Sequence, residues 1–276
     1  MKTTSTRRPA FTLVEMLVVI LIMSILVTLV TLGVTRAMRF ASEVGTKTEM
    51  AQIEQALGVA ALDLGRVPYI PSYLYLWDTP ANAQNDIGGE ANATTKGYKQ
   101  MSLRMLKQMF PNWTSATWTS VPSPLNASQA YVFILGGKGG IEGFHATSTD
   151  PWASGGKRKG PYFNFKPDRL DTTNYKFKDY WNNNNAFLAV YSNQMVGGSI
   201  NTNPDLAGPP RMAKTVSGGT GTLHMPKGYQ IFSAGKDGKW GTTYSPTVAF
   251  NGLLTGDGED DQCNFSESPL GKPIND

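Results

Sequence analysis

Two sets of acidic residues in this chain could do chemistry, and they stand in opposite settings. Glu15 is the only charged residue between Phe11 and Thr35, where the rest of the run is apolar or carries small hydroxyls. An acid at such a position costs on the order of 2.5–3.5 kcal/mol to place at the centre of a lipid bilayer. Glu15 therefore calls for a cationic partner, and an amine is the candidate.

The second set lies near the end of the chain, where Asp237-Gly238 is followed by Asp257-Gly258-Glu259-Asp260-Asp261. Calcium takes 6–8 oxygen ligands, commonly from carboxylates and carbonyls on Gly-containing loops. The four acids of the second run repel one another, and a bound cation would relieve that repulsion. One interpretation is a calcium site with Asp237 and either Asp257 or Asp260 as ligands. The other is a solvated acidic loop without an ion, and the EF-hand spacing is absent.

The segment that holds Glu15 has the dimensions of a membrane span. From Met16 to Thr35 no residue is charged, and a helix rising about 1.5 Å per residue would cross a hydrocarbon core of about 30 Å over this length. Lys2, Arg7 and Arg8 precede the span, so the positive-inside rule places the start of the chain in the cytoplasm and the large remainder outside. The run is longer than the apolar core of a conventional signal peptide, about 7–15 residues, and no clear A-x-A site follows it.

The junction at Ala10–Phe11 joins the leader MKTTSTRRPA to FTLVEMLVVILIMSILVTLVTLGV. This junction resembles the processing and methylation motif of type IV pilins and type II secretion pseudopilins. The resemblance implies that a prepilin peptidase cuts before Phe11 and methylates the new amine, and that Glu15 pairs with an amine of a neighbouring subunit. Ala10 stands where Gly usually precedes the cut; because both residues are small, we expect cleavage to survive. The alternative is an ordinary signal anchor in which Glu15 lies at the headgroup level and has no role.

The resemblance also implies partners and a location. It predicts a single-pass protein of the bacterial inner membrane with a periplasmic globular domain, self-association into a fibre, and contacts with other pseudopilins and an inner-membrane assembly platform. In secretion systems such fibres push substrates outward. Two alternatives stay open: a type IV pilus subunit for adhesion, motility or DNA uptake, and a membrane-anchored binding protein that never polymerises.

The helix is expected to continue beyond the membrane. After Arg39, apolar residues recur at spacings of three and four, which is the pattern of an amphipathic helix. Gly65 and then Pro68 supply a stop signal, so we predict one helix from about residue 11 to residue 64, roughly 80 Å long. The apolar positions are Met50, Ile53, Leu57, Ala60, Ala61 and Leu64, and the other faces carry Lys47, Glu49, Gln52, Glu54 and Asp63.

The predicted organisation has four parts. A leader peptide covers residues 1–10, a transmembrane helix covers 11–35, its amphipathic continuation covers 36–65, and a β-rich globular domain covers 66–276. The predicted fold class is α+β, with the long N-terminal helix packed on an antiparallel sheet that has long loops.

Within the globular part, short runs rich in aromatic and branched residues predict strands. A helix is expected at Ser102–Phe110, ended by Pro111, and the Gly-, Asn- and Pro-rich segment Asn193–Gly221 is predicted to be a loop. The predicted strands are Ala130–Leu135, Tyr162–Phe165, Ala186–Tyr191 and Tyr229–Ser233.

Two local matches extend the resemblance. Asp150-Pro151-Trp152 looks like a D-P-W turn of the major pseudopilins, and Tyr229–Gly241 (YQIFSAGKDGKWG) resembles their strand and S-x-G-x-D-G-x-x-G loop near the end of the chain. In that family the loop and later acids hold calcium, so the resemblance implies the same ion here.

Signatures of catalysis are poor. The chain has two histidines, His145 and His224, and it lacks the H-E-x-x-H and G-x-S-x-G motifs; we predict that it is not an enzyme. The formal charge of +4 falls to +1 without Lys2, Arg7 and Arg8, so its basic character gives no reason to expect a nucleic-acid partner. A single cysteine, Cys263, excludes an internal disulfide.

Overall fold

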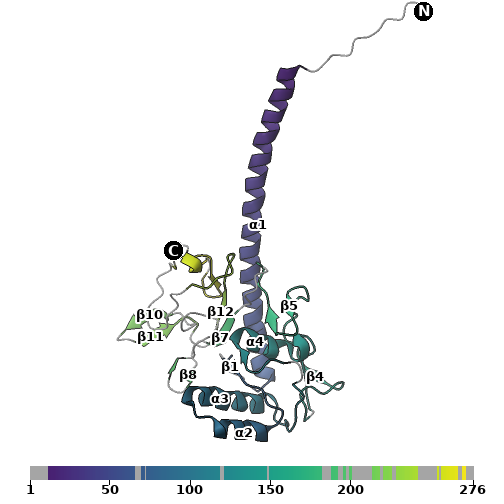
Figure 1. The fold of residues 1–276 in the computed structure, drawn as a ribbon, viewed down its shortest axis with the longest axis vertical. Helices are drawn as coiled ribbons and strands as arrows, with labels where there is room; N and C mark the ends of the chain where they lie inside the picture. Colours follow the sequence, from purple (N-terminus) through teal and green to yellow (C-terminus); the bar gives the residue numbers. More distant parts are fainter. Residues whose placement is uncertain are drawn as a thin grey trace, which may run out of the picture. The chain divides into compact units, whose positions relative to one another are not determined.

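The chain divides into two compact units, residues Met1–Val44 and Gly45–Asp276. In the computed structural model (Figure 1) the described residues are 12–65, 70–71, 73–118, 121–147, 149–181, 188–191, 195–196, 199–200, 213–217, 220–225, 228–241, 254, 256–266 and 269–271. The α+β fold class is confirmed, with one long helix, three shorter helices and small antiparallel sheets among these residues.

The long helix α1 (Leu13–Asp63) confirms the predicted helix almost to its ends. Its first part, in the first unit, leaves every residue from 12 to 41 exposed, including all the large apolar side chains. Its last part, in the second unit, buries the predicted apolar positions Met50, Ile53, Leu57 and Ala60. Gly65 follows with φ 85°, where a side chain would lie 2.8 Å from the Gln108 carbonyl oxygen; glycine is the residue that can end the helix there.

Glu49 corrects the predicted amphipathic pattern, which placed it on an exposed face. Its side chain is 6% exposed and forms an ion pair with Arg169, whose Nη1 donates to Oε2 at 2.9 Å and whose Nη2 donates to Oε1. Arg169 Nη1 also donates to the Lys178 carbonyl at 3.0 Å, and its guanidinium lies 4.6 Å from the ring centres of Phe177 and Tyr180. The bidentate geometry is what allows this charge to be buried.

Helix α4 (Ala127–Gly136) lies at the centre of the second unit, and all ten of its residues are buried. The predicted strand Ala130–Leu135 is therefore wrong. An apolar run that is buried on every side shows no periodicity, so it cannot be assigned to helix or strand from its pattern. The helix start is fixed by a capping box, in which Asn126 Oδ1 accepts from Gln129 N at 3.1 Å and Gln129 Oε1 accepts from Asn126 N at 2.9 Å.

Helices α2 (Pro80–Gly89) and α3 (Ala93–Met109) pack on each other at one end of the second unit (Figure 1). The helix predicted at Ser102–Phe110 is confirmed, but it begins nine residues earlier, because Asn92 Oδ1 caps it by accepting from Thr94 N and Thr95 N, each at 3.0 Å. Lys99 of α3 ties the two helices and their connection together through Asp86 at 2.8 Å and Glu90 at 2.9 Å.

The described strands form five short antiparallel pairs and one three-stranded sheet. The predicted strands at 186–191 and Tyr229–Ser233 are confirmed as β7 (Leu188–Tyr191) and β12, residues 186 and 187 lying outside the described part. Tyr162–Phe165 is not a strand; Tyr162 N donates to Leu135 O at 2.7 Å, and the aromatic rings of this segment pack on the core. The pairs are β1 (Tyr73–Leu74) with β2 (Leu125–Asn126), β3 (Phe144–His145) with β4 (Arg158–Lys159), β5 (Leu170–Asp171) with β6 (Lys176–Phe177), β8 (Met195–Val196) with β9 (Ser199–Ile200), and β10 (Ala213–Ser217) with β11 (Thr220–Leu223).

The segment predicted as one long loop, Asn193–Gly221, contains strands β8, β9 and β10 and the start of β11. That prediction is corrected for these strands, and the remainder of the segment lies outside the described residues. Strands β10 (AKTVS) and β11 (TGTL) contain β-branched Thr and Val, which favour strands, and they pair antiparallel with Ser217 opposite Thr220. The segment as a whole is rich in Gly, Asn and Pro, so its overall composition does not indicate these short strands.

One three-stranded sheet has the order β13-β12-β7, with β13 at Gln262–Cys263 and Phe232 opposite both Cys263 and Leu188. It carries a second small core of Ala127, Phe232, Leu254, Cys263 and Leu270. Cys263 is a free thiol, and burial raises its pKa to about 11. At neutral pH this thiol is therefore protonated and unreactive.

The Asp150-Pro151-Trp152 segment forms a turn that anchors a tryptophan in the main core. Asp150 Oδ1 accepts from Trp152 N at 2.8 Å, and Thr117 Oγ1 donates to Asp150 Oδ2 at 3.0 Å. Trp152 is buried against Trp118, Phe133 and Phe144. The turn therefore has a packing role in this chain.

Candidate functional site

Glu15 lies in the first turn of α1 and closes a capping box with Thr12. The Thr12 backbone N–H and hydroxyl each donate to Glu15 Oε2 at 2.8 Å, and the Glu15 N–H donates to Thr12 Oγ1 at 3.3 Å. These bonds satisfy polar groups at the helix start that would otherwise lack partners. Within the described residues Glu15 forms no ion pair, so its carboxylate is hydrogen-bonded but not neutralised.

The helix around Glu15 is suited to an apolar environment. Residues Leu13–Asp63 include a window that is long and apolar enough to cross a membrane, and none of that window is buried inside the protein. The hydroxyls along it donate to carbonyls of the same helix: Ser24 to Ile20 at 2.9 Å, Thr28 to Ser24 at 2.8 Å and Thr31 to Val27 at 2.8 Å. Because these polar groups are satisfied internally, the helix can enter lipid or pack on another helix without leaving a hydroxyl unpaired.

The predicted processing residues, Ala10 and Phe11, lie outside the described residues. The described chain begins one residue later, at Thr12. The prediction of cleavage between Ala10 and Phe11 therefore rests on the sequence alone. Glu15, four residues beyond Phe11, is among the described residues.

The predicted metal ligands Asp237, Asp257 and Asp260 lie on two facing loops. Backbone N–H groups of these loops donate hydrogen bonds to some of the carboxylate oxygens. Asp260 Oδ2 accepts from Lys236 N at 2.6 Å and from Asp237 N at 2.9 Å. Asp237 Oδ1 accepts from Lys239 N at 2.8 Å, and Asp257 lies 3.9 Å from Lys239 Nζ. Burial raises the pKa of the Asp260 carboxyl.

The two loops approach closely because Gly235 has φ 61°, and a side chain there would lie 2.1 Å from the Asp260 carbonyl oxygen. Across the described part of the chain, no three acids, histidines or cysteines converge in a way that could hold a metal ion. The acids thus have a structural use as acceptors for the loop amides, and calcium binding stays a prediction.

Comparison with known families identifies the N-terminal segment. Residues 6–31 match the prokaryotic N-terminal methylation motif. The chain therefore carries the prepilin-type motif of type IV pilin-like and pseudopilin proteins, and this confirms the resemblance. Family proteins with this motif are structural and not catalytic. No curated protein and no solved structure matches the chain.

Sequence reasoning missed Thr12, although a signal was present. Thr12-Leu13-Val14-Glu15 fits the capping-box pattern T-x-x-E. This pattern predicts a partner for Glu15 on the same chain, in addition to the amine expected on a neighbouring chain.

Proposed function

We propose that this protein is a pilin-like pseudopilin subunit that assembles through α1 into an inner-membrane-based fibre of a type II secretion-like system, with its second unit in the periplasm. One observation carries the proposal: the methylation motif at residues 6–31 coincides with the exposed apolar stretch of α1 up to Thr35, whose only acid is Glu15. An exposed apolar surface of this extent needs lipid or other copies to cover it.

The chemistry of assembly follows from Glu15. Cleavage after Ala10 would free an amine at Phe11, within about one helical turn of the carboxylate. When two parallel copies are offset along the fibre, the amine of one can reach Glu15 of the next, and both charges are neutralised inside lipid. In a separate subunit the Thr12 bonds hold the carboxylate at the start of the helix.

Processing is the first test. Co-expression with a prepilin peptidase is expected to yield a species shortened by the leader, seen as a faster band and as a mass that begins at a methylated Phe11. Ala10→Glu should block the cut, whereas Thr4→Glu, which adds the same charge away from the junction, should not. A native leader that is never shortened would contradict the proposal.

Assembly is the second test. A cysteine at Val27 or Val34, both exposed on the apolar part of α1, is expected to give a ladder of cross-linked multimers in membranes. Native Cys263 is buried and should give no background. Monomers alone would favour a membrane-anchored binding protein that does not polymerise.

A surface pilus subunit for adhesion, motility or DNA uptake would pass both tests. Neighbouring genes discriminate the two roles, because a secretion gene set supports the pseudopilin and a retraction ATPase supports the pilus subunit.

The calcium proposal has its own test. If Asp237, Asp257 and Asp260 rearrange around an ion, calcium should raise the melting temperature relative to chelator, and Asp257→Asn should reduce that difference. Identical melting temperatures in calcium and in chelator would contradict calcium binding.

A further inference from the structure

Opposite charges are collected at two ends of the second unit. Helix α3 contains four basic residues and no acid. Lys99 is engaged by Asp86 and Glu90, while Arg104 and Lys107 are exposed and Lys96 is half-buried; among the described residues none of these three forms an ion pair. Residues 96, 100, 104 and 107 recur at helical spacing, so they share one side of α3.

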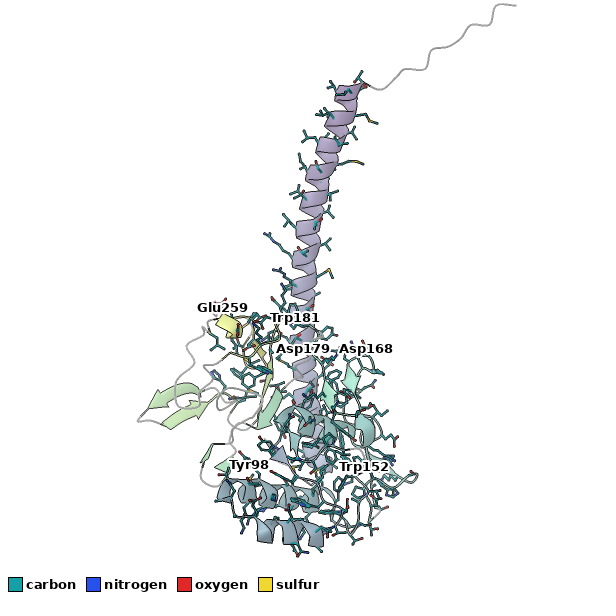
Figure 2. All side chains as sticks on the ribbon, in the orientation of Figure 1. Tyr98, Trp152, Asp168, Asp179, Trp181 and Glu259 are labelled. Carbon is teal, nitrogen blue, oxygen red and sulfur yellow. The ribbon has the colours of Figure 1, made fainter. Side chains whose placement is uncertain are left out.

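The acidic end is the segment 256–261, GDGEDD, with four acids and no base. Asp257 and Glu259 are exposed. Lys239 lies 3.9 Å from Asp257, but both side chains are more than half exposed, and such a surface pair neutralises little. Figure 2 shows Glu259 at one end of the second unit and Tyr98 of α3 at the other.

The distance between the acidic segment and the basic face of α3 can be judged from α1, because each of them lies next to a residue at one end of its last part. Lys47, near the start of this part, donates to the carbonyls of Cys263, at 2.7 Å, and of Ser266, next to the acidic segment. Gly65, just after its end, lies against the Gln108 carbonyl, next to the basic face. The 18 residues from 47 to 65 span about 27 Å of helix axis, which greatly exceeds the Debye length of about 8 Å at physiological salt. The two charged ends therefore do not neutralise each other within one chain.

We propose that these two ends bind each other between copies: the basic face of α3 (Lys96, Arg104, Lys107) on one subunit docks the acidic segment (Asp257, Glu259) of the next. Opposite patches at opposite ends make a heterologous contact, and such a contact repeats into an open fibre instead of closing a dimer. Complementary charge fixes which neighbour binds and in which register. This inference rests on the proposed function, because it supplies a second contact between subunits that α1 already associates.

Charge reversal and charge exchange test the contact in the full-length protein in membranes. Arg104→Glu/Lys107→Glu and, separately, Asp257→Lys/Glu259→Lys should each reduce fibre yield about tenfold, because like charges then face each other. The quadruple variant should restore the yield. The parent fibre should weaken as salt rises from low to about 0.5 M. Far-ultraviolet circular dichroism checks that every variant is folded.

A bis-maleimide cross-linker gives an independent readout. The double variant Lys107→Cys/Asp257→Cys should form a ladder of multimers, whereas a mixture of the two single variants should stop at dimers. Buried Cys263, whose thiol pKa is raised to about 11, should leave the parent uncross-linked.

The Val27→Cys cross-link separates the two proposals. If Arg104→Glu or Glu259→Lys, each added to the Lys107→Cys/Asp257→Cys protein, reduces the 107–257 cross-link while the Val27→Cys ladder persists in the charge-reversed proteins, both proposals stand. Unchanged yields on reversal, failure of the quadruple variant to recover, or a loss confined to the α3 variants, as expected if α3 bound some other anionic partner, would overturn the charged contact and leave the proposed function intact. Absence of a ladder from the Val27→Cys protein without any charge reversal would overturn the proposed function itself.

Discussion

Both parts of α1 present apolar side chains, but the two sets stand in opposite environments. In the first unit, residues 12–41 are all exposed. In the second unit, the segment from Gly45 to Asp63 buries Met50, Ile53 and Leu57 against the core. Among the described residues of the first unit, nothing covers the first part, so its apolar surface is available to lipid or to other copies. The apolar surface of the second part is used in folding.

Each part carries one acid in an apolar setting, and the two acids differ in where their partner lies. Glu49 is neutralised by Arg169, which comes from the same chain 120 residues later. Glu15 is held only by Thr12, with no ion pair among the described residues. The difference teaches that the same residue type can be neutralised within the fold, as at Glu49, or left without a cation among the described residues, as at Glu15; under the proposed function the second case is the one that serves assembly.

The largest expected effect is on the buried pair. Glu49→Leu should lower the free energy of unfolding of the second unit by about 3–5 kcal/mol, because it leaves the Arg169 guanidinium buried without its partner. Denaturant unfolding followed by tryptophan fluorescence measures this. The double variant Glu49→Leu/Arg169→Met should recover most of the loss; a double variant as unstable as the single one would mean that the pair is not the cause.

Glu15→Leu is the matched change in the first part. It should leave the unfolding of the second unit unchanged, yet reduce the cross-linked multimers of a Val27→Cys protein about tenfold, equivalent to about 1.4 kcal/mol of subunit association. Thr12→Val, which removes the hydroxyl but retains the acid, serves as the control and should reduce multimers less. Full polymerisation of Glu15→Leu would show that Glu15 is dispensable for assembly, and the contrast with Glu49 would fail.

Two glycines in the last part of α1, Gly45 and Gly58, differ in how closely the rest of the second unit packs on the helix, and replacing them should have smaller effects on stability. A side chain at Gly58 meets no atom within 4 Å, whereas one at Gly45 would lie 2.9 Å from the Tyr180 ring. Gly58→Ala should raise the free energy of unfolding by about 0.5–1 kcal/mol through helix propensity. Gly45→Ala should gain less or lower it, because the ring must move. Equal gains by denaturant unfolding would indicate that Tyr180 does not pack on α1 as described.

The smallest effect is expected at the more exposed ion group of α2 and α3. Hydrogen bonds from Lys99 hold the pKa of Asp86 and Glu90 below their ordinary values. Their stabilising contribution is therefore present above the ordinary carboxyl pKa of about 4 and is lost as the pH falls toward the lowered values. Lys99→Met should lower the melting temperature by about 1–2 °C at pH 7, and the difference should shrink below pH 4. A difference that persists at low pH would point to lost packing of the lysine chain.

How well local sequence predicts structure depends on whether a pattern has two distinct faces. The apolar positions of α1 between residues 50 and 60 face a core on one side, so their helical period predicts the helix, and this prediction is confirmed. Strand β12 is buried at all five positions; its prediction rests on aromatic and branched residues instead of on a period, and it is also confirmed. Helix α4 is buried on all sides and has no period to detect. The capping residues Asn126 and Gln129 were the signal that marked it as a helix.

The sequence by itself determined the long helix, its membrane-compatible first part, and the position of Glu15 beside the processing motif, because these depend on residues close together in the chain. Only the tertiary structure decided that Glu49 is buried, that Arg169 neutralises it, and that basic and acidic surfaces gather at opposite ends of the second unit. Those features join residues more than a hundred positions apart, and no local period or spacing records which distant segments folding brings into contact.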